Sequence, residues 1–314
     1  MGILRLVLYI GALIATMAVE AVERPYAVVK VPVANLREAP RHGAEMVSQG
    51  IMGTPVIIKD KAGEWLKIEM PDGYEGYMID NSLQPMSQSE FDAWRSSKRY
   101  VVTAMATELK DAPDKDGDTV TPLQLADIIQ IEGEVPQQGF AKAVLPDGRK
   151  GFIAVEDIIP FVPFGRSDTD SLAQLIISRG KKMLGQEYLW GGTSAKGNDC
   201  SGFTRVCYQS AGVYLPRDAW QQALAGEAVA EKDLKPGDLI FFTNNKGRVV
   251  HVGMYIGDGL MMHSSGRVKI DRILASQSHP EMKLYYRKPA KYRRMLTGAP
   301  LESDTKANKL YFNN

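Results

Sequence analysis

An imperfect internal repeat constrains the fold of this chain more than any other feature. Residues 70–78 read MPDGYEGYM, and residues 145–153, which lie 75 positions further along, read LPDGRKGFI. In both copies Pro-Asp-Gly predicts a tight turn between short strand-like runs. A repeat of this length fits two copies of one small domain. We therefore expect two small β-barrels, at residues 26–86 and 99–161, joined by a short helical connector at residues 87–97.

The sequence changes in character after the second expected barrel. Residues 167–184 carry apolar side chains at helical spacing, and a second helix is predicted from residue 200 to about residue 211. Strands and turns follow from residue 239 onward. Helices followed by antiparallel strands indicate an α+β domain at residues 165–290. The polar stretch at residues 291–314 is interpreted as a loose C-terminal tail.

The N-terminus has the pattern of a secretory signal. Arg5 precedes a mostly apolar run that ends near Val19 and is followed by polar residues. This pattern predicts a signal peptide at residues 1–21 and a mature protein that is exported, to a bacterial periplasm. An uncleaved membrane anchor is the alternative. No Cys follows the run, which excludes a lipoprotein anchor, and no second apolar run approaches ~18 residues, so no stable membrane insertion is expected after cleavage.

Charge and composition exclude several classes of protein. The 38 basic and 37 acidic residues give a net charge of +1, which argues against nucleic acid as the main partner. Hydrophobic residues make up 44% of the chain, as in ordinary globular proteins. Two cysteines are too few for a disulfide scaffold.

The two cysteines differ in their expected roles. Cys200 and Cys207 on one helix would lie about 10 Å apart along its axis, which exceeds disulfide reach, so both should be free thiols. Cys207 shares an apolar stripe with Phe203 and Val206, which predicts core packing. Cys200 lies in the first turn, directly after Asp199. The partial positive charge of a helix N-terminus predicts a lowered thiol pKa and a nucleophilic thiolate there.

Two histidines could serve such a nucleophile. Residues 249–265 read VVHVGMYIGDGLMMHSS, which predicts a hairpin. If the hairpin is centred on Gly257, His251 and His263 are cross-strand partners with Cβ atoms about 5 Å apart. One imidazole could accept the thiol proton while the other orients it. Two unrelated strand histidines or a zinc site are alternatives, but no close Cys or His pair has zinc-like spacing, so no metal or cofactor is expected.

Several motifs together resemble the NlpC/P60 family of cysteine peptidases. In chain order they are YLWGG at 188–192, DCSGF at 199–203, LPRD at 215–218, LKPGDLIFF at 234–242, HVGMYIG at 251–257 and HSS at 263–265. The resemblance implies a papain-like α+β core in which a helix bearing the cysteine packs on an antiparallel sheet. The first β-barrel resembles bacterial SH3 domains, through Asn35-Leu36-Arg37, residues 45–47 and residues 73–77. The second copy is more divergent.

The resemblance also implies roles for individual residues. Cys200 matches the family's nucleophile, His251 its general base and His263 the residue that orients the base. Tyr188 matches a tyrosine that helps to stabilise the oxyanion, which a preorganised O–H donor can do. Simple aromatic packing is the alternative for Tyr188.

Two SH3-like domains before the catalytic domain are similar to one subgroup, the γ-D-glutamyl-L-diamino acid endopeptidases, also described as dipeptidyl-peptidase VI. These enzymes cut murein peptides between D-Glu, through its γ-carboxyl, and Lys or diaminopimelate. They require a free N-terminal L-Ala, and the first SH3-like domain closes one end of their groove. The sequence leaves open which diamino acid is preferred and whether the second SH3-like domain binds anything.

A free ammonium needs nearby acceptors if it is to be held away from water. By resemblance the acceptors are Asp199, Ser201 and Asp218 of the catalytic domain, with Tyr74 and Glu45 of the first SH3-like domain. Tyr77 is a rival for Tyr74, Asp199 could also cap the helix, and Asp218 could be purely structural.

The leading hypothesis is therefore an exported, monomeric cysteine peptidase that acts on cell-wall peptides released by other enzymes. Alternatives are an endopeptidase on intact murein with SH3-like wall anchors, a non-catalytic wall-binding protein, and an acyltransferase or amidase that uses the same residues. The intact set Cys200, His251 and His263 argues against the non-catalytic reading.

Overall fold

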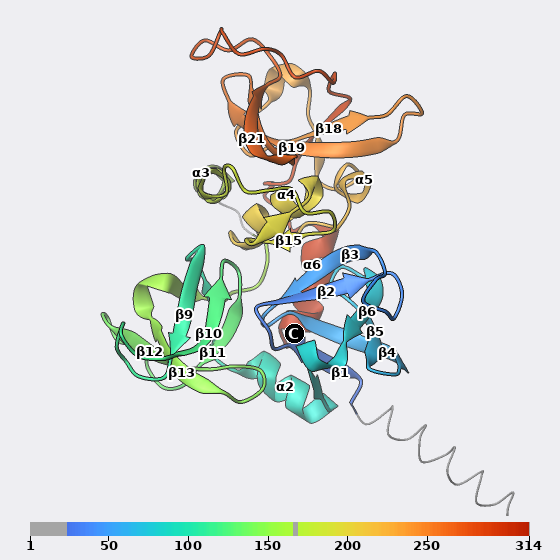
Figure 1. The fold of residues 1–314 in the computed structure, drawn as a ribbon. Helices are drawn as coiled ribbons and strands as arrows, with labels where there is room; N and C mark the ends of the chain where they lie inside the picture. The colour runs from blue at the N-terminus through green and yellow to red at the C-terminus, as the bar shows by residue number, and fades with distance from the viewer. Residues whose placement is uncertain (1–23, 166–168, 314) are drawn as a thin grey trace, which may run out of the picture.

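The computed structural model describes residues 24–165 and 169–313. The predicted signal peptide lies outside these residues. No helix in the described part of the chain is long and apolar enough to cross a membrane. Figure 1 shows two β-barrels, coloured blue and green, beside a layered domain of helices and sheet.

The two barrels are copies of one topology. Each is a seven-stranded sheet, ordered β3-β2-β6-β5-β4-β1-β7 in the first and β10-β9-β13-β12-β11-β8-β14 in the second. Numbered from its own first strand, each follows the order 3-2-6-5-4-1-7. In both repeated Pro-Asp-Gly turns the glycine has a positive φ, 84° at Gly73 and 85° at Gly148, a conformation that glycine adopts without steric cost. The predicted pair of SH3-like domains is therefore present.

The strands of the first barrel are β1 (Tyr26–Val29), β2 (Val33–Arg37), β3 (Met46–Ile51), β4 (Pro55–Ala62), β5 (Trp65–Glu69), β6 (Glu75–Ile79) and β7 (Leu83–Met86). Those of the second are β8 (Arg99–Val102), β9 (Ala106–Lys110), β10 (Thr119–Gln124), β11 (Ile128–Ile131), β12 (Phe140–Val144), β13 (Lys150–Ala154) and β14 (Ile158–Pro160). Short 3-10 turns lie at Asp80–Ser82, Val155–Asp157 and Glu231–Asp233.

The predicted connector between the barrels is helix α2 (Gln88–Ser96). It begins with a capping box in which Ser87 accepts from the Glu90 backbone and Glu90 accepts from the Ser87 backbone. Phe91 and Trp94 are its buried side chains and anchor it to the core.

The third domain is α+β, as predicted. Its sheet has the order β17-β22-β18-β19-β20-β21. Helix α4 packs against β19, β20 and α3, and all its residues except Gln209 are buried. This helix carries both cysteines, which are free. The elements are α3 (Thr169–Lys182), β15 (Thr193–Ser194), β16 (Gly197–Asn198), α4 (Cys200–Gln209), α5 (Ala219–Gln222), β17 (Glu227–Ala228), β18 (Leu239–Thr243), β19 (Val249–Gly257), β20 (Leu260–Ser265) and β21 (Arg267–Arg272).

The interpretation of residues 291–314 as a loose tail is wrong. Strand β22 (Lys291–Arg294) pairs with β18 inside the sheet, and helix α6 (Glu302–Tyr311) runs beside the first barrel (Figure 1). Tyr311 is fully buried, and its carbonyl accepts a hydrogen bond from Arg99 at 2.5 Å. The few apolar residues of α6 are spaced among polar ones, so the segment looks like a solvated tail although one face is packed.

Candidate active site

Cys200 is the first residue of α4, and the turn before it is held by Asp199. The Asp199 carboxylate accepts from the Gly202 N–H at 2.7 Å and from the Gly191 N–H at 3.1 Å, so it caps the helix. Gly202 is required here because a Cβ would lie 1.9 Å from the Gly192 carbonyl oxygen. The DCSGF motif thus folds the loop tightly over the helix start.

The pKa of the Cys200 thiol corrects one expectation. Burial raises that pKa to about 12, and the negative charge of Asp199 raises it further. Hydrogen bonds from the N–H groups of Val252 and Ser201 act in the opposite direction but are outweighed. The sequence argument considered only the helix N-terminus, whereas the thiol is 9% exposed and has lost its solvation. The resting thiol is therefore neutral and needs a base.

The expected base, His251, lies on the β19–β20 hairpin, although not in the expected register. Met254 lies opposite Met262 and Tyr255 opposite Met261, with a register shift before Gly257. The predicted direct pairing of His251 with His263 is therefore wrong. The two rings still meet diagonally, with 2.7 Å between His251 Nε2 and His263 Nδ1.

Asp271 on β21 extends the His251–His263 pair to a hydrogen-bonded chain of three residues, and the sequence did not predict it. Its Oδ2 atom lies 2.9 Å from His263 Nε2. A carboxylate accepts, so His263 Nε2 carries the proton and its Nδ1 accepts from His251 Nε2–H. In this network Nδ1 of His251 carries no proton, so its lone pair is free to accept one, as a general base requires. Only strand register brings Asp271 to this place, and residue spacing does not reveal that register.

Both imidazoles are neutral in the resting protein. Burial, followed by the neighbouring His263, lowers the pKa of His251 to about 3. Burial also lowers the pKa of His263, although Asp271 acts in the opposite direction. A neutral thiol and a neutral imidazole relay suit general-base activation during attack.

A cavity of about 400 Å³ opens beside Cys200. Among the residues that line it are all the predicted substrate contacts and the predicted oxyanion donor: Glu45, Tyr74, Tyr188, Asp199, Ser201 and Asp218. Tyr77 does not line it. His251 and His263 are not among its lining residues and are buried, with 8% and 0% exposure. Burial and the nearby Cys200 raise the pKa of Tyr188, so its hydroxyl stays protonated and can donate.

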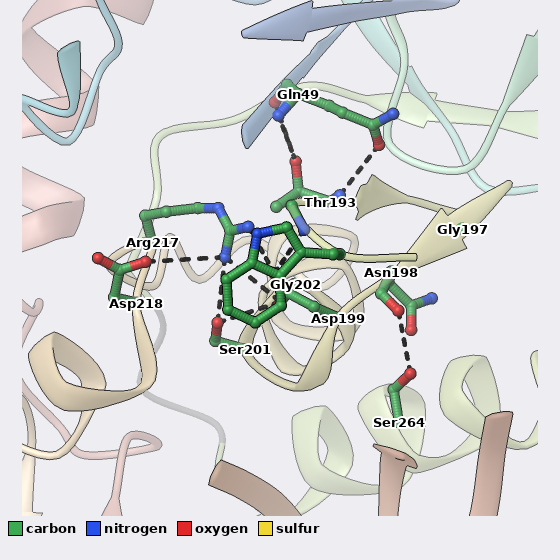
Figure 2. A network of polar contacts seen from close by, with 12 residues as sticks. Gln49, Thr193, Gly197, Asn198, Asp199, Ser201, Gly202, Arg217, Asp218 and Ser264 are labelled. Atoms are coloured by element: carbon green, nitrogen blue, oxygen red, sulfur yellow. Dashed lines mark hydrogen bonds and ion pairs between the residues drawn. The ribbon is translucent and has the colours of Figure 1, made fainter. Parts of the chain in front are cut away.

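Arg217 organises the carboxylates of this cavity (Figure 2). Its guanidinium lies 2.6 Å from Asp199 Oδ2 and donates to Ser201 Oγ at 3.1 Å. Asp218 is less engaged, because its Oδ1 atom lies 4.0 Å from Arg217 and its side chain is 32% exposed. Burial raises the pKa of Asp218, Arg217 acts in the opposite direction, and Trp220 Nε1 donates to Asp218 Oδ2 at 3.3 Å. Asp218 is therefore the acceptor that remains available to a cation; sequence reasoning left Arg217 without a role.

The first SH3-like domain forms one wall of the cavity. Trp190 Nε1 donates to Glu45 Oε1 at 2.6 Å. The backbones approach so closely at Gly191 that a Cβ there would lie 2.1 Å from the Met46 carbonyl oxygen. The first glycine of YLWGG is therefore required by the contact between domains, which sequence spacing did not show.

A buried ion pair fastens the same two domains. Arg205 of α4 lies 2.7 Å from Asp72, and both side chains are 4% exposed. Asp72 is the aspartate of the first Pro-Asp-Gly turn. In the second copy the equivalent Asp147 pairs only with Arg149 at the surface. Of the two repeated turns, the one in the first barrel therefore forms an ion pair with the catalytic domain, and the one in the second barrel does not within the described residues.

Among residues 24–165 and 169–313, no group of three or more His, Cys, Asp or Glu side chains is placed to hold a metal ion. A cysteine at a helix start, an imidazole relay and a lined cavity define the class of cysteine peptidases.

Comparisons with known proteins agree with this class. Residues 185–287 match the model of the NlpC/P60 family, and residues 36–83 match that of the bacterial dipeptidyl-peptidase SH3 domain. A γ-D-glutamyl-L-lysine dipeptidyl-peptidase of Bacillus cereus is 34% identical over 70% of this chain and 67% of its own length. The Bacillus subtilis protein of that name is 30% identical over 72% of this chain and 75% of its own. A crystal structure of an NlpC/P60 family protein from Bacillus cereus superimposes with a TM-score of 0.73 at 28% identity, covering 86% of this chain and 99% of the other.

The chain therefore belongs to the NlpC/P60 family and is a cysteine peptidase with N-terminal SH3-like domains.

Proposed function

We propose that this enzyme hydrolyses the bond between the γ-carboxyl of D-Glu and a diamino acid in murein peptides that have a free N-terminal L-Ala. The product would be L-Ala-γ-D-Glu. The observation that carries this proposal is the cavity beside Cys200, which is walled by the first SH3-like domain and holds the partly free carboxylate of Asp218. The names of the relatives from the two Bacillus species support the same bond.

The substrate amine is held at the walled end of the cavity. Its ammonium pairs with Asp218, and Tyr74 and Glu45 from the first SH3-like domain line the same space. Asp199 and Ser201 contribute mainly through Arg217, which their oxygens already engage. A substrate peptide that extended beyond the N-terminal alanine would clash with this wall. A substrate with a blocked amine therefore loses the ion pair with Asp218 and does not fit sterically.

The chemistry then proceeds in two steps. His251 Nδ1 takes the proton of Cys200 as the sulfur attacks the γ-carbonyl carbon, while Tyr188 donates to the developing oxyanion. The positive charge on His251 is shared through His263 with Asp271. His251 returns the proton to the leaving amine, and a thioester remains on Cys200. His251 next takes a proton from water, which attacks the thioester and releases the dipeptide, and the proton on His251 then returns to the Cys200 sulfur.

We also propose that the protein is exported to a periplasm and acts as a monomer on released peptides. The apolar segment at residues 2–19 supports export. A cavity closed by the chain's own N-terminal domain supports a site that is complete within one copy.

Mass spectrometry of the products tests the proposal. The purified protein should release L-Ala-γ-D-Glu from L-Ala-γ-D-Glu-L-Lys, and a Cys200→Ala variant should release none. An N-acetylated tripeptide should remain intact. Equal cleavage of both substrates would instead support an endopeptidase on intact murein, and a product joined to an added acceptor amine would support acyl transfer. No cleavage of any peptide would support a wall-binding protein.

A further inference from the structure

A second groove, with a volume of about 600 Å³, adjoins the catalytic cavity. It is lined by the turn between β18 and β19 and by Tyr286 and Arg287. Its Arg248 directly precedes Val249 and Val250, which line the cavity beside Cys200. In Figure 1, α4 and α5 lie between the first barrel and the β18–β19 hairpin. The first barrel and this hairpin thus lie on opposite sides of α4 and α5.

A residue next to the groove packs against the histidine pair. The ring of Tyr285 packs 5.1 Å from that of His263, and Tyr286 follows it in the chain. Arg287 donates from Nε to the Tyr286 hydroxyl at 2.9 Å, and its charge contributes to lowering the pKa of His251. The positive charge of Arg287 is thus within electrostatic reach of the reacting bond.

The charged side chains that line the groove are all positive. Lys246, Arg248 and Arg287 line it, and no Asp or Glu does. None of these three cations forms an ion pair with a described acidic residue. Three unpaired cations around one hollow form a site for a carboxylate, and guanidinium groups pair with carboxylates in two-point geometry.

We propose that this groove binds the leaving diamino acid and selects it by its carboxylates. The inference rests on the proposed function and adds the recognition of the leaving half. A diamino acid at the C-terminus of a tripeptide offers its α-carboxylate. Diaminopimelate offers a second carboxylate at the end of its side chain, where Lys offers only an ammonium that three cations repel. Diaminopimelate peptides should therefore be better substrates than Lys peptides.

Four substrates distinguish binding of the α-carboxylate from binding of the side-chain carboxylate. They are L-Ala-γ-D-Glu followed by L-Lys or by meso-diaminopimelate, each with a free or an amidated α-carboxyl. One charge-assisted contact corresponds to about a tenfold change in affinity. We expect kcat/KM to be about tenfold higher for diaminopimelate than for Lys if the side-chain carboxylate is bound, and about tenfold lower on amidation if the α-carboxylate is bound. A preference for diaminopimelate supports the proposal, and a loss on amidation shows in addition that the α-carboxylate is bound. Equal kcat/KM for diaminopimelate and Lys peptides, or a preference for Lys, would overturn it.

Variants assign the effect to the groove. Arg248→Gln and Lys246→Gln change exposed side chains and should reduce the wild-type preference several-fold, mainly through KM. Lys61→Gln, an exposed lysine of the first SH3-like domain, is the matched control and should keep the preference. A preference retained in both groove variants would contradict the proposal. Release of L-Ala-γ-D-Glu from any of the four substrates keeps the proposed function intact, whatever the ratios.

Discussion

Gln49 of the first SH3-like domain and Thr193 of the catalytic domain are joined by three hydrogen bonds (Figure 2). The Gln49 N–H donates to Thr193 Oγ1 at 3.1 Å, that hydroxyl donates to the Gln49 carbonyl at 2.9 Å, and the Thr193 N–H donates to Gln49 Oε1 at 3.0 Å. Both residues are buried. Since Thr193 belongs to the loop that leads to Cys200, the N-terminal domain supports the segment that carries the nucleophile.

The buried pair Asp72–Arg205 should dominate the attachment of this domain. Asp72→Asn leaves the Arg205 charge buried without its partner, which should lower the free energy of unfolding by about 3–5 kcal/mol. Urea titration measures this. Asp147→Asn, at the equivalent turn of the second copy, removes a surface pair and should cost at most about 1 kcal/mol. Equal losses in the two variants would contradict the assigned role.

Asp271 should act as a positioning residue. Asp271→Asn no longer holds His263 in the tautomer that leaves His251 Nδ1 free, so kcat should fall at least about tenfold with little change in KM. Steady-state kinetics with the free-amine tripeptide measures both constants. A purely structural role predicts instead a lower thermal midpoint with an unchanged kcat and pH profile.

Asp218 should determine the preference for a free amine. Asp218→Asn removes the available carboxylate, so KM for the free-amine tripeptide should rise about tenfold or more. Asp60→Asn, in the first SH3-like domain and outside the cavity, is the control. If Asp218→Asn lowers hydrolysis of free and acetylated peptides by the same factor, Asp218 does not bind the ammonium.

The buried His251 should make stability depend on acid pH. Its pKa is about 3 in the folded protein and about 6.5 when unfolded, so the unfolded chain binds more protons between these values. Protonation of His251 in the unfolded chain therefore lowers the free energy of unfolding as the pH falls from 6.5 toward 3. Urea titrations at pH 7 and pH 4.5 should show a smaller loss in His251→Asn than in wild type. Identical losses would contradict the lowered pKa.

Local signals sufficed to predict much of the fold. The repeated Pro-Asp-Gly turns indicated two barrels of one kind, and apolar side chains at helical spacing indicated α3. The placement of Cys200, Tyr188 and Asp218 around one cavity followed from motifs in chain order.

Long-range features were not accessible from the sequence. The contact between Gln49 and Thr193 spans 144 residues, and no local pattern marks it. The bulge near Gly257 shifts the hairpin register, which hid the diagonal His pair and Asp271. The burial of Cys200 depends on packing against β19, so a helix-end argument alone gave the wrong direction for its pKa.

We expect the cavity walled by the first SH3-like domain to restrict this cysteine peptidase to substrates with a free amine. The most direct test is the ratio of kcat/KM for L-Ala-γ-D-Glu-L-Lys and its N-acetylated form, measured with the full chain and with Cys200→Ala as the blank. We predict a ratio of at least about 100, since both an ion pair and the steric fit are lost on acetylation. A ratio near one, with both activities dependent on Cys200, would contradict the claim.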